Sequence, residues 1–124
     1  MAATGHNAKT AAGVLMSDIA FLVNGTPVCV EGANPTQTLL DFLRIDRGLC
    51  GTKEGCNEGD CGACTVVLGE VDNGQMKYSA VNSCIRMAHS VHAMGVWTVE
   101  DLTTSQDALH PAQQAMLDCH GSQC

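Results

Sequence analysis

Positive charge is scarce in this sequence, since six Lys and Arg stand against 13 Asp and Glu and the formal net charge is −7. A surface of this sign repels phosphate backbones and anionic lipid headgroups. The scarcity therefore argues against binding to nucleic acid and against binding to a membrane surface.

Long apolar runs are also missing. No uncharged apolar stretch approaches the ~20 residues that a membrane-spanning helix needs. Residues 1–16 (MAATGHNAKTAAGVLM) lack the continuous apolar block of a secretory signal. Neither an internal repeat nor a low-complexity run is present. Together these absences predict a soluble, cytoplasmic protein.

Cysteine, by contrast, is abundant, with eight residues in a chain of 124. An even number is compatible with a disulfide framework, but such frameworks are typical of small secreted chains that cannot build a core. A chain of this length with 45% hydrophobic residues can bury a core of its own. In a reducing compartment, clustered thiols favour metal binding.

The spacing of four cysteines is specific. Cys56, Cys61 and Cys64 form a C-x4-C-x2-C pattern, and Cys84 follows after 19 intervening residues. This is the plant-type spacing for a [2Fe–2S] cluster, in which one loop supplies three thiolates and a later segment the fourth. The five glycines within residues 48–62 would let the backbone approach the sulfurs, several at positive φ. We expect these four cysteines to be the ligands.

Two other kinds of site compete with the cluster. A structural zinc site usually draws on two close Cys or Cys/His pairs, and only Cys61 and Cys64 have that spacing. A catalytic thiol assisted by His89 or His92 would need one exposed cysteine of low pKa rather than four in a glycine-rich loop. Neither histidine belongs to a recognisable ligand pattern, so both are interpreted as surface residues or core fillers.

Two cysteines outside the pattern have different expected roles. Cys50 lies six residues before Cys56 and is the main competitor if one ligand is misassigned. Cys29 alternates with two valines in an expected strand, so it is predicted to be a small buried hydrophobic residue.

Hydrophobic patterning predicts an α+β domain whose sheet packs on one helix. Asn24-Gly25 and Asp72-Asn73-Gly74 are turn signals, each joining two apolar runs into a hairpin. A short helix is expected at about Leu39–Ile45, with Thr38 as its cap. Residues 82–92 are expected to be helical or irregular. The expected strands cover residues 19–23, 28–30, 65–68, 76–81 and 96–99.

A further helix is predicted near the end of the sequence. Pro111 suits its first position, and Gly121 is expected in a left-handed cap at its end. The sequence offers this helix no partner helix, so we expect it to begin a second unit that is cut off. Its apolar face is expected to carry Ala112, Ala115, Met116 and Cys119.

Residues 51–66 (GTKEGCNEGDCGACTV) resemble the first iron–sulfur motif of xanthine dehydrogenases, within the molybdenum hydroxylase family. Residues 82–84 (NSC) are similar to the segment that bears the fourth ligand of that cluster. Residues 109–114 (LHPAQQ) and 120–124 (HGSQC) resemble the start of the family's second iron–sulfur domain. The resemblance covers residues 18–124.

This resemblance implies a β-grasp, plant-type [2Fe–2S] ferredoxin-like domain at residues 18–100. The truncated start of an α-helical [2Fe–2S] domain would follow at residues 101–124. Residues 1–17, rich in Ala, Thr and Gly and without periodicity, are expected to form a flexible arm before the ferredoxin-like domain. The resemblance also implies that Cys124 is a ligand of a second cluster, which this chain alone cannot complete, and that Gln123 approaches the molybdopterin.

The function implied by the resemblance is electron transfer, with no catalytic residue in this chain. In the parent enzyme, electrons from hydroxylation of hypoxanthine or xanthine at molybdenum would pass through two [2Fe–2S] clusters to FAD and then to NAD+. The implied partners are an FAD domain or subunit and the molybdenum-binding subunit. Alternatives are a small subunit of aldehyde oxidase or carbon monoxide dehydrogenase type, or a free-standing ferredoxin whose acidic surface docks to basic proteins.

Overall fold

The computed structural model describes residues 17–103 and 109–121. The expected arm at residues 1–17 thus lies outside the described residues except for Ser17, which begins the first strand. Within the described residues, no helix is long and apolar enough to cross a membrane. The strands are β1 (Ser17–Val23), β2 (Thr26–Ala33), β3 (Thr65–Asp72), β4 (Gln75–Asn82) and β5 (Gly95–Trp97). The helical segments are α2 (Leu39–Asp41), η1 (Phe42–Asp46), η2 (Ala88–Val91), η3 (Val99–Leu102) and α3 (Pro111–Asp118).

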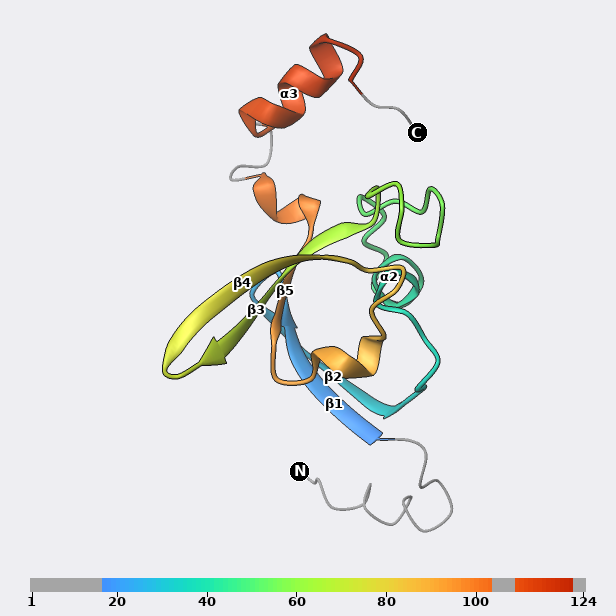
Figure 1. The fold of residues 1–124 in the computed structure, drawn as a ribbon, viewed down its shortest axis with the longest axis vertical. Helices are drawn as coiled ribbons and strands as arrows, with labels where there is room; N and C mark the ends of the chain where they lie inside the picture. Colours follow the sequence, from blue (N-terminus) through green and yellow to red (C-terminus); the bar gives the residue numbers. More distant parts are fainter. Residues whose placement is uncertain (1–16, 104–108, 122–124) are drawn as a thin grey trace.

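The strands form a single five-stranded sheet in the order β2-β1-β5-β3-β4 (Figure 1). β5 lies between the two hairpins, parallel to β1 and antiparallel to β3. Both hairpins predicted from the sequence are confirmed. Their turns contain Asn24-Gly25 and Asn73-Gly74, with φ angles of 51° and 83° in the first turn and 53° and 77° in the second. Positive φ at both central residues matches the right-handed twist of the flanking strands.

The central strand β5 is shorter than the sequence predicted. The Thr98 N–H is donated to Asn24 Oδ1 at 2.8 Å, so the backbone of Thr98 leaves the ladder. Val99 then begins the single turn η3. The prediction that the strand extends to residue 99 is therefore wrong, because a side chain of the first hairpin turn captures the backbone donor.

The helix predicted at residues 39–45 is present as α2 followed by η1. Thr38 Oγ1 accepts a hydrogen bond from the Asp41 N–H at 3.1 Å, which confirms the expected cap. The second part is a π-helix, in which the Arg47 N–H donates to the Phe42 carbonyl at 3.0 Å. The periodicity of a short apolar run does not reveal this wider winding.

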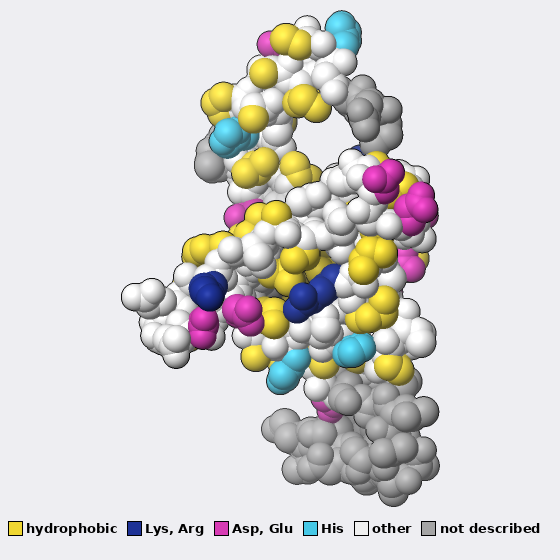
Figure 2. Space-filling view, in the orientation of Figure 1, with side chains coloured by type: hydrophobic (Ala, Val, Ile, Leu, Met, Phe, Trp, Pro, Cys, Tyr) yellow, Lys and Arg dark blue, Asp and Glu magenta, His cyan; other side chains and the backbone are white. Residues whose placement is uncertain are grey.

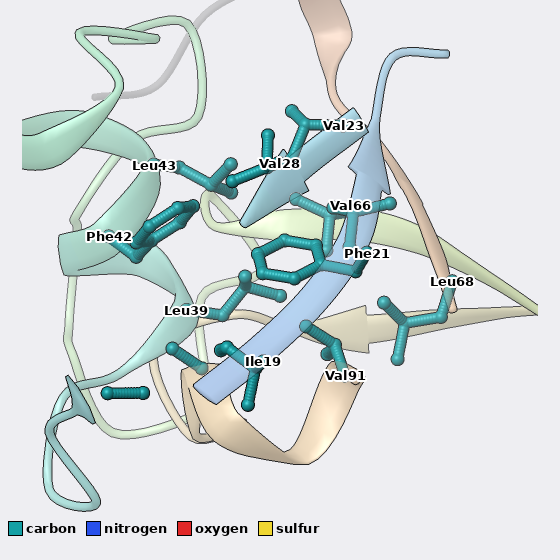
Figure 3. Close-up of a cluster of buried hydrophobic side chains, with 13 residues drawn as sticks. Ile19, Phe21, Val23, Val28, Leu39, Phe42, Leu43, Val66, Leu68 and Val91 are labelled. Atoms are coloured by element: carbon teal, nitrogen blue, oxygen red, sulfur yellow. The ribbon is translucent and has the colours of Figure 1, made fainter. Parts of the chain in front are cut away.

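The core lies between this helix and one face of the sheet (Figure 3). In β1, Ile19, Phe21 and Val23 are buried and the residues between them are exposed, which is the period of two expected of a strand. The Phe21 and Phe42 rings meet at a centroid distance of 5.4 Å. Cys29 is exposed because it pairs with Ala20 on the outer face, so the prediction of a buried Cys29 is wrong.

α3 is the helix predicted to begin at Pro111, and none of its residues is buried. His110 caps it by accepting the Ala112 N–H on Nδ1 at 3.1 Å. The left-handed position after the helix is held by His120, with φ 53°, rather than by Gly121 as predicted. The helix ends one residue earlier than the prediction requires, and the Gly121 N–H closes the turn on the Met116 carbonyl at 2.9 Å.

Candidate metal centre

Residues 48–64 form one long loop without helix or strand, as the glycines predict; we call it the cluster loop. It lies between η1 and β3, and β4 brings the chain back to the same end of the sheet (Figure 1). Three cysteines of the predicted set belong to this loop, and Cys84 lies two residues after β4. The β3–β4 hairpin therefore brings Cys84 back to the cluster loop, although 19 residues separate it from Cys64 in the sequence.

The Cys56 sulfur accepts three backbone hydrogen bonds from its own loop. The N–H groups of Cys61, Glu58 and Asp60 lie 3.3, 3.4 and 3.2 Å from Cys56 Sγ. These bonds, that of Cys61 above all, lower the pKa of Cys56 to about 7, and a hydrogen bond with the Cys61 side chain adds to the effect. The loop is thus shaped to stabilise negative charge on this sulfur.

The Cys61 sulfur is held in the same way, by the N–H groups of Cys56 and Ala63, each at 3.4 Å. A Cβ added at Gly55 would lie 2.6 Å from Cys61 Sγ, so only glycine allows the backbone to approach this closely. Gly59 has a φ of 81°, as predicted for a tightly wrapped loop. Gly55 therefore makes room for a sulfur, whereas Gly59 supplies the positive φ of the wrapped loop.

The other two sulfurs are buried. Cys64 is 3% and Cys84 5% exposed, and both pack against Leu40, which is completely buried. Burial raises the pKa of the Cys84 thiol, and its hydrogen bond with the Cys64 side chain acts in the same direction. Leu40 lies in the helix predicted from the sequence, but its contact with sulfur is a tertiary feature.

Ser83 and Asn82 place the fourth cysteine beside the loop. The buried Ser83 donates to the Cys64 carbonyl twice, from its hydroxyl at 2.7 Å and from its N–H at 3.3 Å. Asn82 Nδ2 donates to the Gly59 carbonyl at 3.1 Å. Neither residue is predicted from the sequence to have a positioning role, and the one available signal is that both directly precede Cys84.

The four sulfurs are brought together as two pairs. Cys56 hydrogen-bonds with Cys61, Cys64 hydrogen-bonds with Cys84, and the charge of Cys56 also acts on Cys84. Among the described residues, no three Cys, His, Asp or Glu side chains converge as they would on one ion. A [2Fe–2S] cluster takes four thiolates over two irons, so paired sulfurs with backbone N–H groups directed at them fit it. A single tetrahedral zinc ion needs four donors around one point.

The remaining candidates lie elsewhere. Cys50 is exposed, and its Sγ donates to the backbone carbonyl of Arg44 in η1 at 3.8 Å. His92 accepts the Ala20 N–H on Nδ1 at 3.0 Å, which ties the segment after η2 to β1. Gln123 and Cys124 lie outside the described residues.

Acidic side chains gather over the cluster loop, as Figure 2 shows at the upper right of that view. Glu54, Glu58 and Asp60 are all exposed. The loop that also carries the exposed Cys61 therefore has more acidic than basic exposed side chains.

Comparisons with known proteins show what this chain is similar to. Xanthine dehydrogenase of Drosophila pseudoobscura pseudoobscura is 46% identical over 110 residues, which cover 87% of this chain and 8% of that protein. Xanthine dehydrogenase/oxidase of Gallus gallus is 43% identical over 86% of this chain and 8% of that protein. The chain therefore spans about 8% of the length of these curated relatives.

Solved structures show the same fold. Quinoline 2-oxidoreductase from Pseudomonas putida 86 is 32% identical with a TM-score of 0.69, over 88% of this chain and 61% of that chain. Aldehyde oxidoreductase from Desulfovibrio desulfuricans ATCC 27774 is 34% identical with a TM-score of 0.69, over 88% of this chain and 11% of that chain. The α+β, ferredoxin-like prediction is confirmed. A model of the 2Fe-2S iron-sulfur cluster binding domain matches residues 21–88, more than half of the chain, and this chain belongs to that family.

Proposed function

We propose that this chain is the iron–sulfur electron-transfer part of a xanthine dehydrogenase, in which Cys56, Cys61, Cys64 and Cys84 hold one [2Fe–2S] cluster. The observation that carries the proposal is the arrangement of these four sulfurs as two pairs, three of them in a loop whose backbone N–H groups point at sulfur and the fourth, Cys84, beside it. When bound, such a cluster takes up and releases single electrons.

The residues of the chain control the surroundings of the sulfurs. N–H groups directed at Cys56 and Cys61 stabilise negative charge, and such bonds are among the levers that set a cluster's potential. Leu40 excludes water from the Cys64 and Cys84 side. Because Cys61 is exposed, electrons enter and leave most readily on the side of that sulfur.

The larger enzyme is also part of the proposal. Electrons released by hydroxylation of hypoxanthine or xanthine at molybdenum would reach this cluster on the way to FAD and NAD+, in the cytoplasm. Residues 18–100 would form the ferredoxin-like domain, and residues 101–124 would open a helical domain in which Cys124 is a ligand of a second [2Fe–2S] cluster and Gln123 approaches molybdopterin. Identities of 43–47% to xanthine dehydrogenases support this enzyme.

Two observations favour competing functions. Solved relatives include a quinoline 2-oxidoreductase and an aldehyde oxidoreductase, at the lower identities of 32% and 34%. These favour a related hydroxylase with another substrate. The exposed acidic side chains over the cluster loop favour a free-standing ferredoxin that docks to basic partners.

The first experiment measures iron and acid-labile sulfide in the anaerobically purified native protein. About two of each per chain are expected, with the visible absorption of a [2Fe–2S] cluster. A folded chain that holds zinc, or no metal, would overturn the proposal.

Size-exclusion chromatography of the native complex separates the remaining functions. Co-elution with flavin and molybdenum proteins and xanthine-dependent reduction of NAD+ support the proposed enzyme. Elution as an isolated small redox protein supports the ferredoxin. A complex that oxidises quinoline or aldehydes but not xanthine identifies the related hydroxylase instead.

A further inference from the structure

A chain of hydrogen bonds fastens the start of the cluster loop to the segment after β5. The Gly51 N–H donates to Glu100 Oε2 at 2.7 Å, across 49 positions of sequence. The Thr98 hydroxyl donates to Glu100 Oε1 at 2.7 Å and accepts from Asn24 Nδ2 at 2.9 Å. Glu100 is thereby anchored to the β1–β2 turn on one side and holds the cluster loop on the other.

Gly51 is packed so closely against this carboxylate that no other residue fits without movement. An added Cβ would lie 2.6 Å from Val99 Cγ1 and 2.7 Å from Glu100 Oε2. Real Cβ atoms do not approach side-chain atoms at such distances. Glycine is therefore required at position 51 by the close contact with Val99 and Glu100, and not by a positive φ. Thr98, which orients the carboxylate, is only 4% exposed.

Glu100 accepts these bonds as an anion. Burial by itself would raise the pKa of its carboxyl group, but the hydrogen bonds from Thr98 and Gly51 outweigh burial and, with the nearby Lys53 charge, lower it. Hydrogen bonds to an ionised acceptor are stronger than those between neutral groups. The Gly51–Glu100 contact is therefore a strong local restraint.

Cationic side chains restrain the same stretch from the other direction. Arg44 Nη1 donates to the carbonyls of Cys50 and Thr52, at 3.0 and 2.9 Å. The N–H of Gly51 lies between those two carbonyls in the sequence and goes to Glu100. The peptide groups 50–51 and 52–53, on either side of the 51–52 peptide, are thus held by charged partners.

The restrained stretch is joined directly to a predicted ligand. The Lys53 N–H donates to the Ala63 carbonyl at 3.1 Å, and that carbonyl belongs to the peptide that leads into Cys64. We propose that Glu100 is a positioning residue for the iron–sulfur centre: by holding Gly51 it sets the path of residues 51–53, and through the Lys53–Ala63 bond it sets the position of Cys64. This inference rests on the proposed function.

The test uses the full chain, anaerobically reconstituted with iron and sulfide, as wild type and as Glu100→Ala, Glu100→Gln and Asp101→Asn. Bleaching of the visible absorption under an iron chelator and the visible circular dichroism are measured. Glu100→Ala should bleach about tenfold faster, the effect of losing one charge-assisted hydrogen bond. Its visible circular dichroism should also change, because the sulfur positions change.

The other variants distinguish the effect of losing the Gly51–Glu100 contact from the effect of losing a charge and from a failure to fold. Glu100→Gln should bleach at an intermediate rate, because its amide oxygen can still accept the Gly51 N–H. Asp101→Asn removes the same charge from the same turn at an exposed residue and should match wild type. If Glu100→Ala does not fold, Gly51→Ala displaces the contact from the loop side and should show the same two changes.

Two results would overturn the inference while leaving the proposed function intact. One is a Glu100→Ala protein that bleaches like Asp101→Asn. The other is a set of Glu100 and Gly51 variants with lower thermal stability but wild-type bleaching and visible circular dichroism, which would mean a purely structural role. A folded wild-type chain without iron and sulfide would instead overturn the proposed function itself.

Discussion

The sheet and the cluster loop lie side by side but are stabilised by different interactions. In the sheet and its helix, Leu39, Leu43 and Val96 are completely buried and the apolar core is continuous. Within residues 48–64, all of them described, only Thr52 and Cys64 are buried. The sheet is therefore stabilised by the hydrophobic effect, and the loop by directed hydrogen bonds to sulfur, to carbonyls and to Glu100.

This difference indicates that the order of the cluster loop, and not that of the sheet, depends on the group that the sulfurs bind. Apolar burial needs no ligand, so we expect the sheet to keep its fold without one. The loop, in contrast, gathers thiolates and carries Thr52 Oγ1, which is buried and has no hydrogen-bond partner within the described part of the chain. An unpaired buried hydroxyl costs about 1–3 kcal/mol. The loop is therefore the region whose order a bound cluster should increase.

The sharpest way to separate the two regions is to remove one predicted ligand. Cys61→Ser should abolish the visible absorption of the reconstituted protein while far-ultraviolet circular dichroism stays that of a folded sheet. Cys29→Ser, on the outer face of the sheet, should leave the absorption intact. If Cys50→Ser removes the absorption and Cys56→Ser does not, the ligand assignment is wrong.

The converse change weakens the apolar core between the helix and the sheet. Leu43→Ala removes a completely buried side chain from the core and should lower the free energy of unfolding by about 2–5 kcal/mol. Urea unfolding followed by far-ultraviolet circular dichroism measures this. Val71→Ala, at a position 70% exposed, should change it by less than about 1 kcal/mol. An equal effect of both substitutions would contradict the assigned core.

A smaller effect is expected from crowding one sulfur. Gly55→Ala places a Cβ where the structure leaves 2.6 Å to Cys61 Sγ, so the loop must shift to bind a cluster. Bleaching under a chelator should become several-fold faster than in wild type, by analogy with overpacking elsewhere in proteins. Gly74→Ala, in the β3–β4 turn with no atom near its added Cβ, should keep the wild-type bleaching rate despite a strained φ of 77°.

The smallest effect concerns pH in the cluster-free protein. Because hydrogen bonds lower the pKa of Cys56 to about 7, its alkylation rate should be half-maximal near that pH, while Cys84, whose pKa burial raises, reacts only at higher pH. Mass spectrometry after timed alkylation measures both. A depressed pKa in the folded state means that the stabilisation is complete above the pKa of a free thiol and is lost as the pH falls through about 7. Identical profiles for the two cysteines would contradict the two environments.

Local signals in the sequence were the reliable ones. Both Asn-Gly turns, the Thr38 cap and the glycine-rich loop were predicted because each depends on residues close together in the chain. The ligand set rests on the same kind of signal, a fixed spacing, and stays a prediction. The errors at Thr98, Cys29 and Gly121 each concern which partner a backbone or side chain finds.

By itself, the sequence determined the order of the elements, the two hairpins and a cysteine pattern that names a cluster type, because turn preferences and ligand spacing act over a few residues. Only the tertiary structure decided that Ser83 and Leu40 adjoin the sulfurs and that Glu100 holds Gly51. Those contacts join residues tens of positions apart. They exist because the sheet register and the packing of the helix bring distant segments to one end of the fold.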